Sequence, residues 1–415
     1  MKERLAGVEP LARLLWPPFF LCALLVVTWV IIDNVFSGGS GKDVFYTQTA
    51  LRGFLMLIIV LALQIFSGNS GVLSFGHVAF VAIGAYMSAL LTIPPEIKSF
   101  TYLTMADKFP WLSYWILPAK LSALEGTLAG AGFALAFAIL IAPPIVRLKG
   151  VQAGIATLAL LVIVNVFIIQ TPSITRGAST LIGVPNTTTL LSVMVWASIF
   201  VGVAYAFQQS RHGLRLRASR ENERAARSVG VRVPVERAIA WVLSGFVAGV
   251  AGALYGHAFG GTFSPQDFYF NTNGFDIVLL PIAMLVIGGM TSVTGAVVGC
   301  YFLTVAYTVF NRPDALGITE GKPPSGTANL VLGFVLLATL ALRPRGLTGG
   351  REIPWPTEWS FDWVRRLPEN TCRLLRGEVR PAGLVWLRER YRGVREPDGP
   401  SSPEGPAASS TESRT

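Results

Sequence analysis

Charged residues, cysteine and histidine are all scarce in this chain of 415 residues. Only 14% of the residues are Asp, Glu, Lys or Arg, whereas soluble globular domains carry about 25%. This scarcity excludes an ordinary soluble enzyme. Cys22, Cys300 and Cys372 lie far apart and form no CxxC pair, so the sequence predicts neither a disulfide framework nor a zinc site. The three histidines are scattered as well, and we expect no metal ion and no cofactor.

Long runs without a charged residue occupy much of the chain. They cover residues 14–32, 53–95, 126–146, 150–175, 177–210, 238–266, 277–311 and 323–342. Because a membrane-spanning helix needs about 20 apolar residues, the runs 53–95 and 277–311 are long enough for two helices each. The sequence therefore predicts an all-α polytopic membrane protein of about ten segments. We expect the segments at 15–33, 50–66, 72–92, 123–146, 151–170, 189–207, 238–258, 275–289, 293–310 and 327–342.

The distribution of positive charge predicts which segment ends face the cytoplasm. Counted from a cytoplasmic N-terminus, the inner loops hold 15 Lys and Arg residues and the outer loops hold eight, Lys42 and Arg52 among them. Cytoplasmic loops carry the excess of Lys and Arg, so we expect both termini to be cytoplasmic. The net charge of +10 then indicates contact with anionic membrane lipids rather than nucleic acid. The first segment is expected to be a retained helix, because no A-x-A cleavage site follows it.

The C-terminal part of the chain differs in composition from the rest. Residues 349–395 are rich in Arg and Trp, including Trp355 and Trp386, which suits a segment lying on the membrane surface. Residues 396–415 are mostly Pro, Ser and Gly and predict a disordered tail. The expected division is a membrane domain at 1–348, with a cytoplasmic loop at 208–237, followed by these two segments. A dispensable tail is the plainer alternative.

The chain carries no recognisable energy source of its own. The glycine-rich run at 38–42 is not a phosphate-binding loop, since Phe36 stands where the first glycine of that motif would be. Asp33 and Asp276 lie at the ends of predicted segments, and the segment interiors offer no carboxylate that could carry a coupling ion. We therefore expect no enzymatic activity. Either the protein is a passive channel, or a partner supplies its energy.

The largest inner loop has features of a docking surface. Residues 210–237 contain eight Arg and three acidic residues, and the pattern predicts a short helix that starts near Ser219 and ends at Gly230. Ala225 and Ala226 would form a small, smooth surface that a groove on a partner accepts. A solvated loop that serves topology alone is the equal alternative. The expected ion pairs on this helix are Glu221 with Arg224 and Glu223 with Arg227.

Glycines and isolated polar residues recur within the apolar segments. Small residues let helices approach closely in lipid, so the spaced glycines predict a tightly packed bundle. Single polar residues either line a translocation path or form hydrogen bonds to a neighbouring helix. The expected packing glycines are Gly71, Gly76, Gly84, Gly245, Gly249, Gly252, Gly288, Gly289, Gly295 and Gly299. The candidate path residues are Ser74, His77, Thr157 and Asn165.

Four blocks of the sequence, taken together, are similar to a known family. The blocks are 67–86 (SGNSGVLSFGHVAFVAIGAY), 212–230 with the following span at 238–256, 286–299 (VIGGMTSVTGAVVG) and 342–347 (LRPRGL). In this order and spacing they resemble the permeases of branched-chain amino acid ABC importers of the LivM type. The resemblance covers about residues 50–348. It is poorer at 271–281, and Val72 stands where the family commonly has Gln.

This resemblance implies a permease subunit of an ATP-driven importer in the bacterial inner membrane, with the ABC importer permease fold. Such a subunit would pair with a second homologous permease. Each would contact one of two cytoplasmic ATPase subunits, and a periplasmic or lipid-anchored binding protein would deliver the substrate. The family docks on its ATPases through an E-A-A…G pattern. Glu223, Ala225, Ala226 and Gly230 match this pattern, with one extra residue between Glu223 and Ala225. By the resemblance, the ATPase-coupling residues are Glu221, Glu223, Ala225, Ala226 and Gly230.

The resemblance favours branched-chain or similar small amino acids as the substrate. Because close relatives in the family move urea, short amides or other amino acids, these solutes remain alternatives. A channel or secondary carrier that works without ATP is a second hypothesis, and it predicts transport by this chain alone. A membrane scaffold that recruits partners through its basic tail is a third.

Overall fold

The computed structural model of the protein describes residues 9–35, 41–101, 108, 110–269, 276–311, 327–343 and 346–353. All of them belong to the first of the two units into which the chain divides, Met1–Trp359. The predicted surface segment beyond residue 353 and the predicted disordered tail at 396–415 lie outside the described residues.

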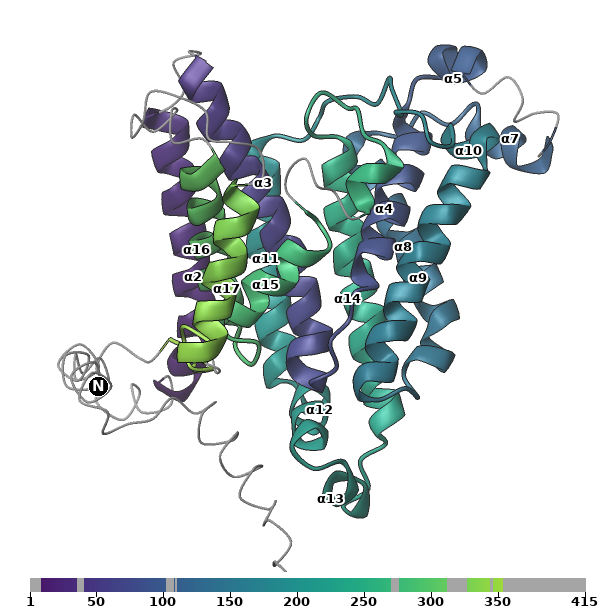
Figure 1. The fold of residues 1–415 in the computed structure, drawn as a ribbon. Helices are drawn as coiled ribbons and strands as arrows, with labels where there is room; N and C mark the ends of the chain where they lie inside the picture. The colour runs from purple at the N-terminus through teal and green to yellow at the C-terminus, as the bar shows by residue number, and fades with distance from the viewer. Residues whose placement is uncertain are drawn as a thin grey trace, which may run out of the picture. The chain divides into compact units, whose positions relative to one another are not determined.

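Helices occupy all ten positions at which the sequence predicts a membrane segment (Figure 1). These ten are α2 (Glu9–Val35), α3 (Gly41–Leu63), α4 (His77–Thr92), α8 (Ala123–Ile145), α9 (Gly150–Gln170), α11 (Leu190–Gln209), α14 (Val233–Gly256), α15 (Leu279–Gly288), α16 (Val293–Asn311) and α17 (Thr327–Leu342). Shorter elements are the π-helix η1 (Gln64–Gly68), α5 (Pro95–Thr101), α7 (Pro110–Ile116), α10 (Pro172–Thr175), α12 (Arg211–Glu221), α13 (Glu223–Ser228) and the 3-10 helix η2 (Pro265–Phe268).

The predicted all-α membrane class is confirmed, whereas ten complete crossings are not. Seven helices are long and apolar enough to cross a membrane, and three further apolar helices are shorter. One of these, α15, has ten residues and is therefore about 15 Å long, half the thickness of the hydrocarbon core of about 30 Å. Such a helix needs the protein around it, because it does not reach both interfaces.

Two boundaries differ from the sequence prediction. The predicted helix at 72–92 begins five residues later, at His77. Arg52, which the charge count assigned to an outer loop, lies inside α3 and within the span Val44–Gly68. The guanidinium carbon of Arg52 is 4.8 Å from the centre of the Phe259 ring, a cation–π contact that stabilises the charge there. The charge of Arg52 thus has an aromatic partner where it lies within the helix.

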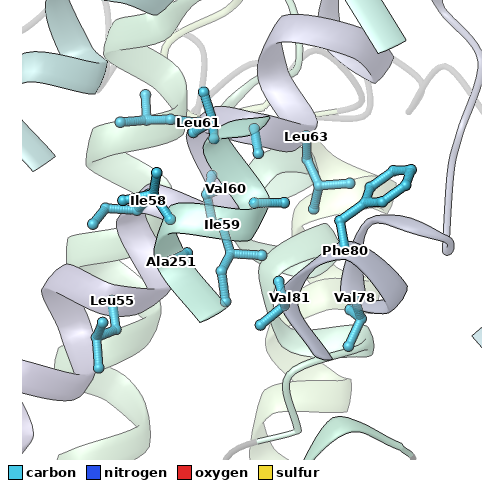
Figure 2. Packing of buried hydrophobic residues seen from close by; sticks show 14 of the residues in the cluster. Leu55, Ile58, Ile59, Val60, Leu61, Leu63, Val78, Phe80, Val81 and Ala251 are labelled. Carbon is cyan, nitrogen blue, oxygen red and sulfur yellow. The ribbon is translucent and has the colours of Figure 1, made fainter. Parts of the chain in front are cut away.

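The core of the described bundle lies around α3. In its most apolar stretch 78% of the residues are buried, against 17% for α2. Figure 2 shows Leu55 and Ile59 of α3 in one apolar cluster with Val81 of α4 and Ala251 of α14. A helix that is apolar on all sides is stable where other helices surround it. The sequence of α3 thus fits its central position, and α2 lies at the periphery.

Glycines bring α4, α8 and α14 into close contact. A Cβ atom added to Gly84 of α4 would collide with the carbonyl oxygen of Gly249 in α14, and one added to Gly252 would collide with that of Val81. A Cβ on Gly245 would lie 2.7 Å from a side chain of α8. Contacts of this kind stabilise helix pairs in lipid because the backbones themselves are in van der Waals contact.

The glycine-rich block at 286–299 forms a tight hairpin of α15 and α16. A Cβ on Gly288 would collide with the carbonyl oxygen of Gly295, and one on Gly299 with that of Met284. Gly289 follows α15 with a φ of 122°, a backbone conformation that favours glycine. The chain can therefore reverse direction at this point and pack the two helices against each other.

Candidate functional site

A break in the helical backbone separates α3 from α4. The end of α3 is the π-helix η1, and residues 71–76 are not helical. Gly71 has a φ of 72°, and a Cβ on Gly76 would lie 3.0 Å from the carbonyl oxygen of Thr157 in α9. Non-helical backbone at membrane depth is tolerated where protein buries it or where it lines a cavity. Single π-helical turns also occur frequently at functional sites. We call residues 71–76 the helix break.

Side-chain hydroxyls satisfy the backbone N–H groups of the helix break. The hydroxyl oxygen of Thr157 accepts a hydrogen bond from Phe75 N at 3.2 Å. The hydroxyl of Ser74 accepts one from Gly76 N at 3.3 Å. An unpaired buried N–H group costs about 1–3 kcal/mol, so these bonds stabilise the break. Ser74 and Thr157, two of the candidate path residues, are thus both located at the helix break.

His77 begins α4 and joins the helix break to α14. Its Nδ1 lies 3.0 Å from Ser74 Oγ and its Nε2 lies 2.9 Å from Ser244 Oγ. The ring is fully enclosed by protein and packs against Phe66 and Trp241. Both ring nitrogens therefore have partners within the protein, and a water-filled path at this point would require the cluster to open.

Asn165 is not part of this cluster. It lies two turns further along α9 than Thr157, and its amide donates to the carbonyl oxygen of Pro265 in η2 at 3.0 Å.

An apolar cavity of about 250 Å³ lies between α2, α3 and α16, and none of the four candidate path residues lines it. Within the described part of the chain, no group of three or more His, Cys, Asp or Glu residues could hold a metal ion.

The predicted short helix in the inner loop is two helices. α12 begins after Ser210, whose hydroxyl accepts from Gly213 N at 3.2 Å. It ends at Glu221, because Asn222 is extended and its side chain accepts from Ala225 N at 3.0 Å, which starts α13. The prediction of one helix from near Ser219 is therefore wrong. The expected pair of Glu221 with Arg224 is not among the ion pairs of the described residues, since these residues lie on separate helices.

Gly230 ends α13 as expected from its position. It has a φ of 85°, and the N–H of Val231 donates to the carbonyl oxygen of Ala226 at 3.0 Å. A glycine in the left-handed conformation with this pattern of hydrogen bonds is a common helix end. Figure 1 shows α12 and α13 beyond the ends of the bundle helices, which leaves α13 accessible.

The two alanines of the expected docking surface have different environments. Ala225 is exposed, whereas Ala226 is 4% exposed and packs within the chain. Of the two alanines, only Ala225 is therefore exposed on the surface of α13 in this structure. Val229, with 79% of its area exposed, stands beside Ala225 at the end of α13 and was missed by the sequence prediction. The apolar tip of α13 consists of Ala225 and Val229.

Glu223 attaches α13 to the bundle. Its carboxylate lies 2.9 Å from Lys149 Nζ in the turn between α8 and α9, and 3.6 Å from Arg237 of α14. The predicted pair with Arg227 is formed as well. The hydrogen bond from Lys149, with smaller contributions from the neighbouring arginines, lowers the pKa of Glu223 below its usual value. The charged carboxylate thus holds α13 to two other elements at neutral pH.

Three further contacts fix α12. Glu236 of α14 is buried and lies 2.7 Å from His212 and 3.3 Å from Arg215. Arg220 donates to the carbonyl oxygen of Gly68, the last residue of η1, at 2.8 Å. The same side chain is so close to Gly71 that a Cβ there would lie 2.8 Å from its Cγ. Arg220 therefore connects the inner loop directly to the helix break.

Comparison with known proteins agrees with this architecture. The family described as "Branched-chain amino acid transport system / permease component" matches residues 45–340. LivM of Salmonella typhimurium, a high-affinity branched-chain amino acid transport system permease protein, is 28% identical over 79% of this chain and 74% of its own length. LivH of Methanocaldococcus jannaschii, a probable branched-chain amino acid transport permease protein, is 29% identical over 38% of this chain. The nucleoside ABC transporter permease protein NupC of Lactococcus lactis is 29% identical over 48%.

The extent of these matches differs. The alignments cover 47% of the length of LivH and 63% of that of NupC, so this chain spans about half of those relatives. No solved structure matches the chain. The family match itself covers well over half of the chain and includes the helix break, α12, α13 and the hairpin of α15 and α16. The chain therefore belongs to the family of branched-chain amino acid ABC transport permeases, and it is a multi-pass membrane protein.

Proposed function

We propose that the chain is the permease subunit of an ATP-driven importer that moves branched-chain or similar small amino acids across a bacterial inner membrane. Membership of the family supports the reaction class, and the relatives named LivM support the substrate class. Because one relative is named as a nucleoside permease, substrate identity requires its own assay. Urea, short amides and other amino acids are the alternatives.

The proposed complex contains partners of three kinds. A second homologous permease completes the membrane part, two cytoplasmic ATPase subunits bind ATP, and a periplasmic or lipid-anchored protein delivers the substrate. Both termini of this chain would be cytoplasmic, and α12 and α13 would then face the ATPases. ATP hydrolysis takes place on those subunits, so this chain is not an enzyme.

The contact between Arg220 and Gly68 is the observation that supports coupling between the inner loop and the interior of the bundle. When paired ATPases close, they displace α13, and the ion pairs of Glu223 and Glu236 make α12 and α14 move with it. Arg220 then pulls on the carbonyl oxygen of Gly68, the end of the π-helix that leads into the helix break. A non-helical segment can change its dihedral angles without breaking a ladder of helical hydrogen bonds. The break is therefore where a movement of the inner loop alters the interior.

The path of the substrate would run beside the helix break. Ser74, His77 and Thr157 are located there. The hydrogen bonds of His77 to Ser74 and Ser244, and that from Phe75 N to Thr157, close the interior in the present conformation. Opening exposes hydroxyl and imidazole groups that can bind the ammonium and carboxylate groups of an amino acid. Asn165 would contact the substrate in a separate part of the same path.

The ATPase surface that fits the tip of α13 is an apolar groove with an acidic rim. Ala225 and Val229 present a small apolar face, and the exposed side chain of Arg224 stands beside them. A short helix in a groove gains affinity from apolar contacts of this kind, while neighbouring charges fix its register.

Arg substitution of the tip tests the docking. We expect Ala225→Arg to weaken ATPase binding about tenfold or more, because a long charged side chain cannot enter an apolar groove. ATP-driven uptake by the reconstituted complex would fall accordingly. Ala178→Arg is the matched control, since Ala178 is an exposed alanine three residues after α10, and Figure 1 shows α10 at the end of the bundle opposite to α13. Full uptake by both variants would show that α13 is not the docking helix.

A further inference from the structure

The residues after α17 form a strap across the turn between α15 and α16. We define the strap as residues 346–353, which lie beyond the family match at 45–340. The N–H of Leu347 donates to the carbonyl oxygen of Ile287 at 2.8 Å, and that of Thr348 donates to Gly288 at 3.1 Å. The Thr348 hydroxyl lies 3.3 Å from that of Ser292. The strap is therefore attached to the hairpin on both sides of its turn.

The strap ends with a carboxylate on the first turn of α16. One oxygen of Glu352 accepts from Val293 N at 2.8 Å. The other accepts from Thr294 N at 3.1 Å and from the Thr294 hydroxyl at 2.6 Å. The first N–H groups of a helix have no partner within the helix, and a negative charge is stabilised next to them. Glu352 therefore caps α16 from a distant part of the sequence.

The same carboxylate contacts the last turn of α11. Gln208 Nε2 donates to Glu352 Oε1 at 2.9 Å, and Gln208 Oε1 accepts from Gln64 Nε2 in η1 at 3.2 Å. Gln64 and Gln208 are both almost completely buried. A buried amide that loses its partner costs about 1–3 kcal/mol, so this chain of three side chains is expected to move together rather than separate.

Gln208 is also a point of attachment for α12. Arg217 donates from Nη2 to the carbonyl oxygen of Gln208 at 2.8 Å. Burial lowers the pKa of Arg217, and the nearby charge of Glu352 acts in the opposite direction. One turn further along α12, Arg220 holds Gly68. α12 therefore reaches the helix break directly, and it reaches the hairpin of α15 and α16 through Gln208 and Glu352.

We propose that Glu352 is a positioning residue through which the strap makes the hairpin of α15 and α16 follow α12. The role of Glu352 in the transport cycle rests on the proposed function. The connection that Glu352 makes between Gln208 and the start of α16 does not depend on that function. Glu352 contacts neither substrate nor ATPase in this account. It acts through Gln208, and its loss would leave the hairpin behind when α12 moves the helix break.

Hydrogen exchange on the purified full-length chain tests the connection without any partner. Glu352→Gln removes the charge but keeps the size of the side chain, and Arg351→Ala is the matched control, because Arg351 is an exposed neighbour in the strap. We expect Glu352→Gln to raise amide exchange about fivefold or more at Val293 and Thr294 and also in α12. Faster exchange confined to the first turn of α16 would mean that Glu352 is a helix cap alone, and would overturn the proposal.

Reconstitution with the ATPases tests the use of the connection. Glu352→Gln should lower the number of substrate molecules taken up per ATP hydrolysed by about fivefold or more, while ATP hydrolysis continues and Arg351→Ala leaves the ratio unchanged. An unchanged ratio for Glu352→Gln would contradict a role in coupling. Absence of ATP-driven uptake in the unsubstituted complex would instead contradict the proposed function, and the exchange experiment would still decide the connection.

An engineered disulfide distinguishes two roles of Glu352, which are holding the strap on the hairpin and transmitting the movement of α12 to it. The hydroxyls of Ser292 and Thr348 are close enough that Ser292→Cys with Thr348→Cys can hold the strap on the hairpin when Glu352 is replaced. We expect uptake per ATP to remain low in this triple variant under oxidising conditions, because the amide at position 352 has one acceptor oxygen, where the carboxylate has two, for Gln208, Val293 and Thr294. If oxidation restored uptake per ATP and a reductant lowered it again, Glu352 would serve only to hold the strap on the hairpin, and the proposal would be overturned.

Discussion

Buried polar side chains join parts of the bundle that are far apart in sequence. His77 contacts Ser244, and His257 lies 2.8 Å from the hydroxyl of Thr92. His77, at the start of α4, thus connects α4 to α14. His257, the residue after α14, contacts the other end of α4. Because hydrogen bonds are stronger in an apolar interior than in water, each contact adds to the glycine packing between these helices.

Lys98 of α5 is a buried cation that lies outside the membrane segments. Its ammonium group donates to the carbonyl oxygens of Ile116 and Ala119 at 3.0 and 2.6 Å, and it is completely buried. Burial lowers its pKa from the usual 10.5 to about 8. Between these two pH values the unfolded chain holds a proton that the folded protein has released, so stability should rise with pH in that window.

Substitution of Lys98 tests this pH dependence. Relative to Lys98→Met, the unsubstituted protein should gain on the order of 1 kcal/mol per pH unit between about pH 8 and pH 10. Thermal unfolding in detergent at a series of pH values measures this gain. Lys120→Met, at an exposed lysine of the same connection, should show no such trend. A difference between Lys98→Met and the unsubstituted protein that stays constant with pH would contradict the assigned pKa.

Residue types predicted some of these contacts and missed others. Ser74, His77 and Thr157 stand out in the sequence because each is polar in apolar surroundings. Their partners do not: Ser244 is one serine among many, and the bond from Arg220 to Gly68 joins residues 152 positions apart. Glu352 carries no sequence signal, since its role depends on where the strap meets the start of α16.

Helix contacts at the scale of elements depend on glycines that have no room for a side chain. Gly252→Ala would place a methyl group against the backbone of α4, whereas Gly132→Ala on α8 meets nothing within 4 Å. We expect Gly252→Ala to destabilise the protein by about 1–3 kcal/mol and Gly132→Ala to be neutral or slightly stabilising. Melting temperatures of the two variants in the same detergent decide this. Equal melting temperatures would mean that α4 and α14 can separate at little cost.

The positions of the helices could be predicted from the uncharged runs of the sequence. The interruptions between helices could not. Eight uncharged runs correspond to ten helices, because apolar length determines what a membrane accepts and two of the runs are long enough for two helices each. The break at 71–76 replaces the start of a predicted helix, since side-chain hydroxyls supply hydrogen bonds that a helix would otherwise make. The inner loop contains two helices because the side chain of Asn222 caps the second, a local competition that charge spacing does not reveal.

On the scale of the whole molecule, the described contacts converge on α12. Ion pairs of Glu236 fix it to α14, Arg220 connects it to the helix break, and Arg217 connects it to Gln208. The inner loop is thus attached to separate parts of the bundle. A partner that displaces the loop would move these parts together, which is the behaviour required of a permease that takes its energy from other subunits.

Transport into sealed vesicles tests this dependence on partners most directly. Vesicles would contain either this chain alone or the chain with its second permease, its ATPases and its binding protein, each with and without ATP. We expect uptake of a branched-chain amino acid by the complete complex with ATP, and none by the chain alone. Uptake into vesicles that contain only this chain, without ATP, would contradict the dependence on partner ATPases and identify a channel or secondary carrier.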